Sequence, residues 1–290
     1  MLTDAEKEHF ILQGYLVVRD ERGIDSQKVE NCLRGINHAL GKPHSLSEGG
    51  AQKNMGKLDG SFSQSLTRDL ISGLWVGKAF AREGQDFHEV RDNHGAQIAL
   101  RFPERPRSLY ELLNAANLVR SGAAWHTDGL RRGKQHPFSL LLGVALSDTD
   151  EEHKGNLLIW PGKHKLVHRC LTSESKHGFD VSRLRKMLKV DQNFDRGEEV
   201  RDHDNVPNLP PLGKPHSVLL KKGDLVLLHP DLPHSGGPNW GADIRIMIYY
   251  RLTFGRAELG EEQHAEEHRR DMLHDFHSSF RKMRDGLEGT

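Results

Sequence analysis

The amino-acid sequence predicts a mainly β protein with flanking helices, built as a sandwich or jelly roll. Several short apolar segments, each bounded by glycine or proline, follow one another between residues 96 and 255. One of these segments, 244–252, alternates strictly between apolar and other residues, as a strand with two different faces does. Helical patterns gather before the strands. We therefore expect one domain over residues 1–290, with an N-terminal helical layer in 1–95 and the β core in 96–255.

The N-terminal layer begins with a predicted helix between Thr3 and Gly14. Thr3 and Glu6 have capping-box spacing, in which each side chain reaches the backbone N–H of the other residue. Gly14 is a typical left-handed helix stop. The patterns that follow predict a strand over 15–18, a helix over 25–41 and a loop over 42–65.

The β core is predicted from runs of apolar residues separated by turn signals. The expected strands span 97–102, 137–146, 157–160, 218–220, 225–228 and 244–252, and a helix is expected over 108–119. A polar insertion over 166–215 interrupts the core, and insertions of about fifty residues are typical of a functional lid or of disorder. A charged helix over 258–285 follows the core.

The charge balance argues against partners that are recognised by charge alone. The chain has 41 basic and 41 acidic side chains, so we expect neither nucleic acid nor an anionic membrane as a partner. Cys32 and Cys170 give no disulfide framework. No basic region followed by an apolar run opens the sequence, and no segment is long enough to span a bilayer, so we expect a cytoplasmic protein.

A set of histidine, aspartate and arginine residues indicates the chemistry. His126 and Asp128 stand two positions apart, which places both side chains on one face of an extended strand. A second imidazole, from His229 or His234, would complete two imidazoles and one carboxylate. That ligand set leaves open positions on the metal and is typical of non-haem Fe(II) that activates oxygen. Arg245 offers a guanidinium suited to the far carboxylate of a dicarboxylic co-substrate.

The chain resembles the phytanoyl-CoA dioxygenase family of Fe(II)- and 2-oxoglutarate-dependent oxygenases. The resemblance rests on Gly14-Tyr15-Leu16-Val17-Val18, Trp125-His126-Thr127-Asp128-Gly129, Ala145-Leu146-Ser147-Asp148, the stretch 155–165, Lys222-Gly223-Asp224, and the eleven-residue step from His234 to Arg245. It implies a double-stranded β-helix, the fold of cupin-like jelly rolls. It also implies that His126, Asp128 and His234 hold Fe(II), that Arg245 binds 2-oxoglutarate, and that O2 is consumed with release of succinate and carbon dioxide. A small-molecule or acyl substrate would be hydroxylated.

Particular positions refine what the resemblance implies. In related halogenases a small residue replaces the carboxylate, so Asp128 implies hydroxylation or another oxidative outcome. Gly143 stands where relatives often carry tryptophan, and Gly236 stands where some carry a hydroxyl residue. Both positions help to hold the co-substrate in relatives. Two other functions fit the same ligand set: a non-catalytic sensor or scaffold that binds 2-oxoglutarate and metal, and a zinc hydrolase, in which Arg245 would have no evident role.

Other polar residues receive structural interpretations. Arg251 lies on the same strand face as Arg245, but we expect it to be too far along the strand to share the site. His264 and His268, four residues apart, are interpreted as part of a solvated helix face. Gln97 and Arg101 lie on the strand before the metal motif, and no role is assigned to them.

Overall fold

The computed structural model describes residues 2–19, 22–40, 52–54, 60–81, 87–89, 96–105, 126–128, 130–131, 134–135, 138–172, 214–254 and 261–288. The strands are β1 (Tyr15–Val18), β2 (Gln52–Asn54), β3 (Phe87–Glu89), β4 (Gln97–Arg101), β5 (Leu130–Arg131), β6 (Lys134–Gln135), β7 (Leu140–Ala145), β8 (Leu157–Ile159), β9 (His216–Val218), β10 (Leu225–Leu228), β11 (His234–Gly236) and β12 (Arg245–Phe254). The helices are α1 (Asp4–Gln13), α2 (Ser26–Leu40), α3 (Gly60–Ile71), α4 (Val76–Phe80), α6 (His164–Thr172), α8 (Glu261–Arg270) and α9 (Ser278–Glu288).

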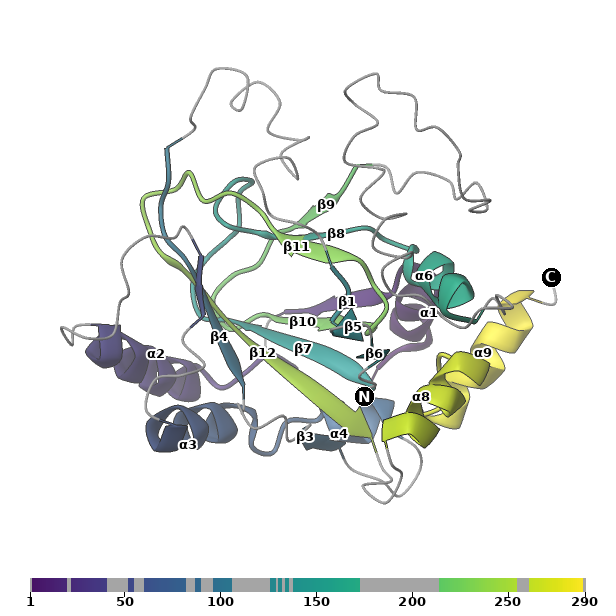
Figure 1. The fold of residues 1–290 in the computed structure, drawn as a ribbon. Coiled ribbons are helices and arrows are strands. Elements are labelled where there is room, and N and C mark those ends of the chain that lie inside the picture. The colour runs from purple at the N-terminus through teal and green to yellow at the C-terminus, as the bar shows by residue number, and fades with distance from the viewer. Residues whose placement is uncertain are drawn as a thin grey trace, which may run out of the picture.

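Two antiparallel sheets make up the core. In the described part of the chain, the larger sheet has the strand order β1-β10-β7-β12-β4-β2, with β3 beside β12, and the smaller sheet has the order β11-β8-β9. Figure 1 shows the smaller sheet lying across one face of the larger sheet, and the helices gathered at the opposite side and at one end. This arrangement confirms the predicted jelly roll with an outer helical layer.

Strand β12 shows why the sequence folds into layers. Ile246, Ile248 and Tyr250 belong to a hydrophobic cluster that includes the helices, whereas Met247 and Tyr249 belong to a second cluster that joins the two sheets. Successive side chains of a strand point to opposite faces, so the observed alternation places the residues at 245, 247, 249 and 251 on the face that looks toward the smaller sheet. A site between the sheets can therefore take its residues from this face.

The N-terminal elements form as their local signals predict. Thr3 accepts a hydrogen bond from the backbone of Glu6 and Glu6 accepts one from the backbone of Thr3, which completes the capping box at the start of α1. Gly14 ends the helix in the left-handed region, with φ of 77°. Strand β1 follows and pairs with β10.

Two predictions about the helices and loops are wrong. The expected loop over 42–65 contains strand β2, paired with β4, and the first residues of α3. The expected single helix over 258–285 is two helices, α8 and α9, separated by a turn that inserts Phe276 into the core. The break between α8 and α9 has no glycine or proline and is imposed by core packing, whereas β2 is imposed by its partner strand β4.

The polar insertion starts later than the sequence predicts. Helix α6 occupies 164–172 and buries Leu166 and Val167, so the start of the predicted insertion belongs to the packed structure. The rest of the insertion, from residue 173 to 213, and the helix expected over 108–119 lie outside the described residues.

The C-terminal helices close one end of the core. Phe280 of α9 packs against Phe10 of α1, Phe80 of α4 and Phe276, with ring centroids 5.2 to 6.1 Å apart. Such contacts between aromatic rings contribute beyond simple burial. Within the described residues, no helix is both long enough and apolar enough to cross a membrane.

Candidate metal centre

The backbone brings His126 and His234 side by side. The N–H of His126 donates to the carbonyl of His234 at 2.9 Å, and the reverse hydrogen bond measures 3.0 Å. The two residues thus form an antiparallel bridge, in which side chains directly opposite each other share one face. Their ring centroids lie 4.5 Å apart. Two imidazoles more than a hundred positions apart in the chain therefore reach the same point.

Asp128 completes a group of three potential metal ligands. Its Oδ1 atom lies 3.3 Å from Nε2 of His126 and 4.0 Å from Nε2 of His234, and the three ligand atoms lie within 4.8 Å of one another. Metal–ligand bonds of about 2.1 Å place neighbouring donor atoms about 3 to 4 Å apart. The spacing of these three atoms fits one ion with little rearrangement.

The protonation of the group also suits a cation. Burial, with a further contribution from His126, lowers the pKa of His234 to about 4, so its ring is neutral near pH 7. Nδ1 of His234 donates to the carbonyl of Leu232 at 2.9 Å, which leaves the lone pair on Nε2. Burial would raise the pKa of Asp128, but His126, His234 and Arg251 together hold it well below its usual range.

His229, the alternative second imidazole, points elsewhere. Its Nε2 donates to the carbonyl of Met272 at 3.2 Å, and its Nδ1 accepts from the backbone of Asp231 at 3.2 Å. Both ring nitrogens are therefore in use, and the ring lies 5.1 Å from that of His164. The structure groups His234, and not His229, with His126 and Asp128.

Arg251 does share the site, so its predicted separation from the site is wrong. Its Nη2 atom donates to Oδ2 of Asp128 at 2.8 Å and to Oε1 of Gln97 at 3.2 Å. The prediction did not allow for the length of the arginine side chain, which reaches back to Gln97, the β4 partner of Tyr249, and to Asp128. Alternation along the strand was the signal available, since it placed Arg251 on the inner face, where a charge needs a partner.

Arg245 and Arg101 form a second polar group on the same inner face. They are paired across β12 and β4, and each is less than a tenth exposed. Arg245 donates from Nε to the carbonyl of Gly155 at 2.7 Å and from Nη1 to that of Ala99 at 3.4 Å. Burial and the charge of Arg245 lower the pKa of Arg101 to about 10. Two buried guanidinium groups side by side favour an anion between the sheets.

The two glycines that depart from the family pattern make room for Arg101 of this second group and for Tyr249 of β12. A Cβ atom at Gly236 would lie 2.7 Å from Nη2 of Arg101. A Cβ atom at Gly143 would lie 2.7 Å from Val226 and 3.0 Å from the ring of Tyr249. Arg101 and Tyr249 thus occupy the space that larger residues would fill. The sequence did not reveal their part in the site, because the space for these two side chains depends on the missing Cβ atoms of Gly236 and Gly143.

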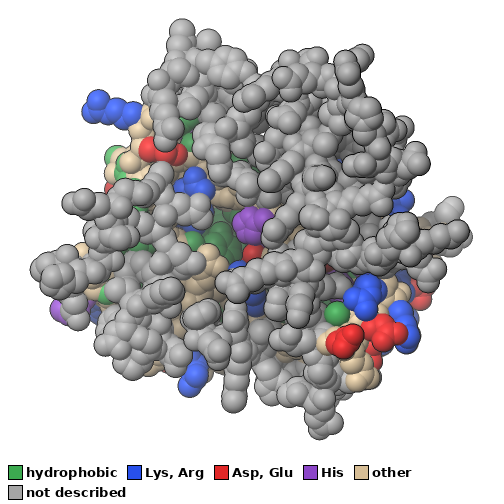
Figure 2. Space-filling model, in the orientation of Figure 1, with side chains coloured by type: hydrophobic (Ala, Val, Ile, Leu, Met, Phe, Trp, Pro, Cys, Tyr) green, Lys and Arg blue, Asp and Glu red, His purple; other side chains and the backbone are tan. Residues whose placement is uncertain are grey.

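The candidate centre is open on one side. The side chain of His126 is 56% exposed, whereas those of Asp128 and His234 are 10% and 7% exposed. Figure 2 shows a hollow near the middle of one face of the molecule, with histidine, basic and hydrophobic side chains visible in it. A buried carboxylate and imidazole beside an accessible imidazole give a centre that a substrate can approach.

Comparisons with known proteins agree with this fold. A model of the phytanoyl-CoA dioxygenase (PhyH) family matches residues 12–247. The structure resembles that of SnoK, a non-heme alpha-ketoglutarate-dependent carbocyclase from nogalamycin biosynthesis, with 14% identity over 87% of this chain and 84% of that one and a TM-score of 0.51. It also resembles the epimerase SnoN in complex with Fe³⁺, alpha-ketoglutarate and nogalamycin RO, with 15% identity over 86% and 82% and a TM-score of 0.51. No curated protein matches the sequence.

Proposed function

The chain belongs to the phytanoyl-CoA dioxygenase family of enzymes, which use Fe(II), 2-oxoglutarate and O2, and on that premise we propose that it hydroxylates a small organic substrate. Succinate and carbon dioxide would be the co-products. The observation that supports the proposal best is the convergence of His126, Asp128 and His234 on one point between the sheets. Two imidazoles and one carboxylate leave open the positions that a co-substrate and oxygen need.

His126, Asp128 and His234 would hold the iron through Nε2, Oδ1 and Nε2. The hydrogen bond from Nδ1 of His234 to Leu232 sets the tautomer that leaves Nε2 free to bind. Arg251 would orient the carboxylate, because it occupies Oδ2 and directs Oδ1 toward the imidazoles. Bound ferrous iron supplies the change of oxidation state that lets O2 react with a closed-shell substrate.

Arg245 would bind the distal carboxylate of 2-oxoglutarate, and Arg101 would assist it. Both guanidinium groups are buried on the inner face of the larger sheet, and they repel each other. A carboxylate between them would remove that repulsion and accept hydrogen bonds in the planar geometry that guanidinium groups offer. Gly236 contributes by leaving space for Arg101.

The presence of Asp128 supports hydroxylation as the outcome. The carboxylate fills one metal position, so a halide has no place among the protein ligands. Cyclisation and epimerisation, the reactions named for SnoK and SnoN, are the alternative outcomes. The product must therefore be analysed for one oxygen atom that comes from O2.

The test measures succinate formed from 2-oxoglutarate with Fe(II) and O2 present, with and without a library of small organic substrates. The native chain should form succinate, and His126→Ala and Asp128→Ala should not. His216→Gln changes an exposed histidine on β9 and serves as the matched control that keeps activity. Equal succinate from the native chain and His126→Ala would refute the enzymatic proposal. A product without oxygen from ¹⁸O2 would refute hydroxylation.

A further inference from the structure

A second group of metal-binding side chains is assembled from three separate elements. His168 comes from α6, Asp231 from the connection between β10 and β11, and His268 from α8. Oδ2 of Asp231 lies 2.8 Å from Nε2 of His268 and 3.4 Å from Nδ1 of His168, and the ligand atoms lie within 4.8 Å of one another. These residues have the same donor types as the candidate iron centre, at similar spacing.

The burial of these side chains contradicts the solvated helix face expected for His264 and His268. The side chains of Asp231 and His268 are 3% and 5% exposed, and that of His168 is 13% exposed. Polar groups so far from water need partners to offset their lost hydration. The α8 histidines therefore face inward, and each meets an aspartate, His264 meeting Asp275 and His268 meeting Asp231.

His168 carries a ring nitrogen that the described residues leave without a hydrogen bond. Its Nδ1 atom is buried, and its 3.4 Å approach to Asp231 is not aligned as a hydrogen bond. A buried nitrogen in that state costs free energy, whereas a bond to a metal ion would use its lone pair. This atom distinguishes the group from an ordinary pair of histidine and aspartate.

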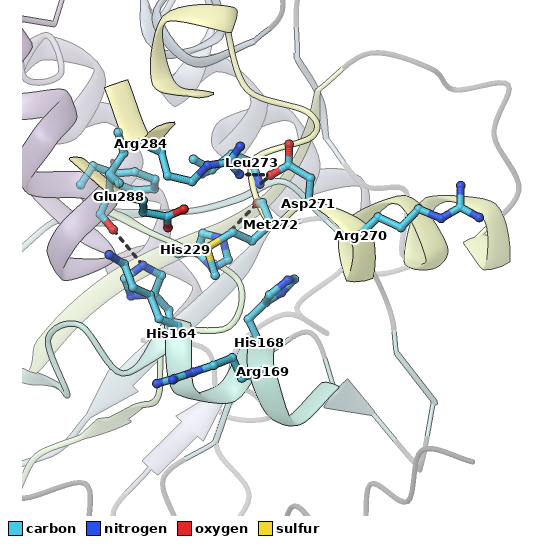
Figure 3. A pocket seen from close by; sticks show the side chains of 13 residues that line it. His164, His168, Arg169, His229, Arg270, Asp271, Met272, Leu273, Arg284 and Glu288 are labelled. Carbon is cyan, nitrogen blue, oxygen red and sulfur yellow. Dashed lines mark hydrogen bonds and ion pairs between the residues drawn. The ribbon is translucent and has the colours of Figure 1, made fainter. Parts of the chain in front are cut away.

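A cavity gives access to the group. It has a volume of about 400 Å³ and is lined by His168 and by residues of α1, α6, α9 and the turn between α8 and α9. Figure 3 shows His168 and Arg169 projecting from α6 at one side of this cavity and Arg270 and Asp271 at the other. Water from the cavity can supply the fourth ligand that a tetrahedral ion requires beside three protein ligands.

A neighbouring histidine cluster differs in its position relative to the cavity. Asp275 accepts hydrogen bonds from Ser139 at 2.7 Å and from His264 at 2.5 Å, and Nε2 of His274 lies 3.1 Å from its other oxygen. Both carboxylate oxygens are therefore engaged, and all three metal-binding side chains of this cluster are buried. His168 lines the cavity described above, whereas His264, His274 and Asp275 do not.

We infer that His168, Asp231 and His268 form a second metal site that binds Zn²⁺ and fastens α8 to α6 and to the connection that leads into His234. Zinc accepts imidazole and carboxylate ligands in a tetrahedral arrangement and needs no redox chemistry. The site uses a helix beyond residue 247, where the family match ends. It is therefore a feature of this chain in addition to the candidate iron centre.

The test counts zinc ions bound to chelator-stripped protein by equilibrium dialysis and elemental analysis. The native chain should bind two equivalents, one at each site. The double variant His126→Ala with Asp128→Ala should bind one, and adding His168→Gln or Asp231→Asn to it should leave none. His168→Gln alone, a change at a partly exposed side chain, should bind one, and the control His216→Gln should bind two.

The outcomes separate this site from the candidate iron centre. Zinc that stays bound when His168→Gln or Asp231→Asn is added to the double variant would overturn the inference. Zinc that is lost on adding His264→Gln instead would overturn it as well. If only the candidate iron centre fails to bind metal, the native chain should bind one equivalent of zinc, and the double variant should still bind it. In the double variant, zinc at a hundredfold excess over its dissociation constant should raise the Tm by about 5 °C. No shift would contradict the proposed fastening.

Discussion

Replacing Arg251 tests the least expected contact of the candidate centre. Arg251→Met keeps much of the side-chain volume but removes the guanidinium that donates a hydrogen bond to Oδ2 of Asp128 at 2.8 Å. The two side chains are 16% and 10% exposed, so the pair is close to buried. Loss of one partner of a buried ion pair costs about 3 kcal/mol or more, because the other charge stays without compensation. The metal-free protein should lose that much stability.

The metal affinity of Arg251→Met should show whether Arg251 acts by orienting Asp128 or through its own charge. A residue that orients a metal ligand typically contributes about 10- to 100-fold to metal affinity. Removing the positive charge of Arg251 from beside the metal ion would by itself raise the affinity. Because Arg251 holds one carboxylate oxygen while the other faces both imidazoles, we expect orientation to dominate and the affinity to fall.

The assay combines urea unfolding of the metal-free protein with titration of Mn²⁺ as an oxygen-stable substitute for Fe(II). Arg19→Met is the matched control, since Arg19 is 58% exposed and lies 3.8 Å from Asp224. An arginine that exposed, at that distance from its carboxylate, contributes less than about 1 kcal/mol. Affinity that is unchanged or higher in Arg251→Met would refute the orienting role, and a stability loss no larger than that of Arg19→Met would refute the buried pair.

Three further predictions follow from single contacts. Arg245→Lys should raise the half-saturating concentration of 2-oxoglutarate about tenfold, because a point charge replaces a planar fork; an unchanged value in the succinate assay would remove Arg245 from the co-substrate site. The hydrogen bond from Arg22, opposed by partial burial and assisted by Thr3, lowers the pKa of Glu6 from 4.5 to about 2. The stability that Glu6 contributes is thus present above pH 4.5 and is lost as the pH falls toward 2, so the Tm difference between the native chain and Glu6→Gln should shrink over that range; a constant difference would contradict it. Phe280→Ala, at a fully buried ring, should cost about 3 to 5 kcal/mol in urea unfolding, and a loss below 1 kcal/mol would mean that α9 does not close the core.

Local signals in the sequence determined the elements whose causes are local. The capping box of Thr3 and Glu6 and the stop at Gly14 act within a few residues, and α1 begins and ends where they predict. The alternation in β12 reflects the pleat of one strand, so its two faces were assigned correctly. The resemblance carried the jelly-roll topology, which no single segment encodes.

Contacts between distant residues decided the rest of the site. The partner of Arg251 is Asp128, which lies 123 positions earlier, and the space for Arg101 depends on a missing side chain at Gly236. The sequence placed each of these residues on a strand face, but it did not establish where two faces meet along their length. That registration results from the packing of whole sheets.

The burial of His264 and His268 likewise depends on tertiary contacts. The pattern of α8 is strongly polar, and by itself it is typical of a solvated helix. His264 and His268 are buried because aspartates from the β10–β11 connection and from the turn after α8 lie against them. The sequence by itself determined which donor types the chain contains. Only the folded structure determined which of them share a point in space, because that depends on the free energy of packing elements far apart in the chain.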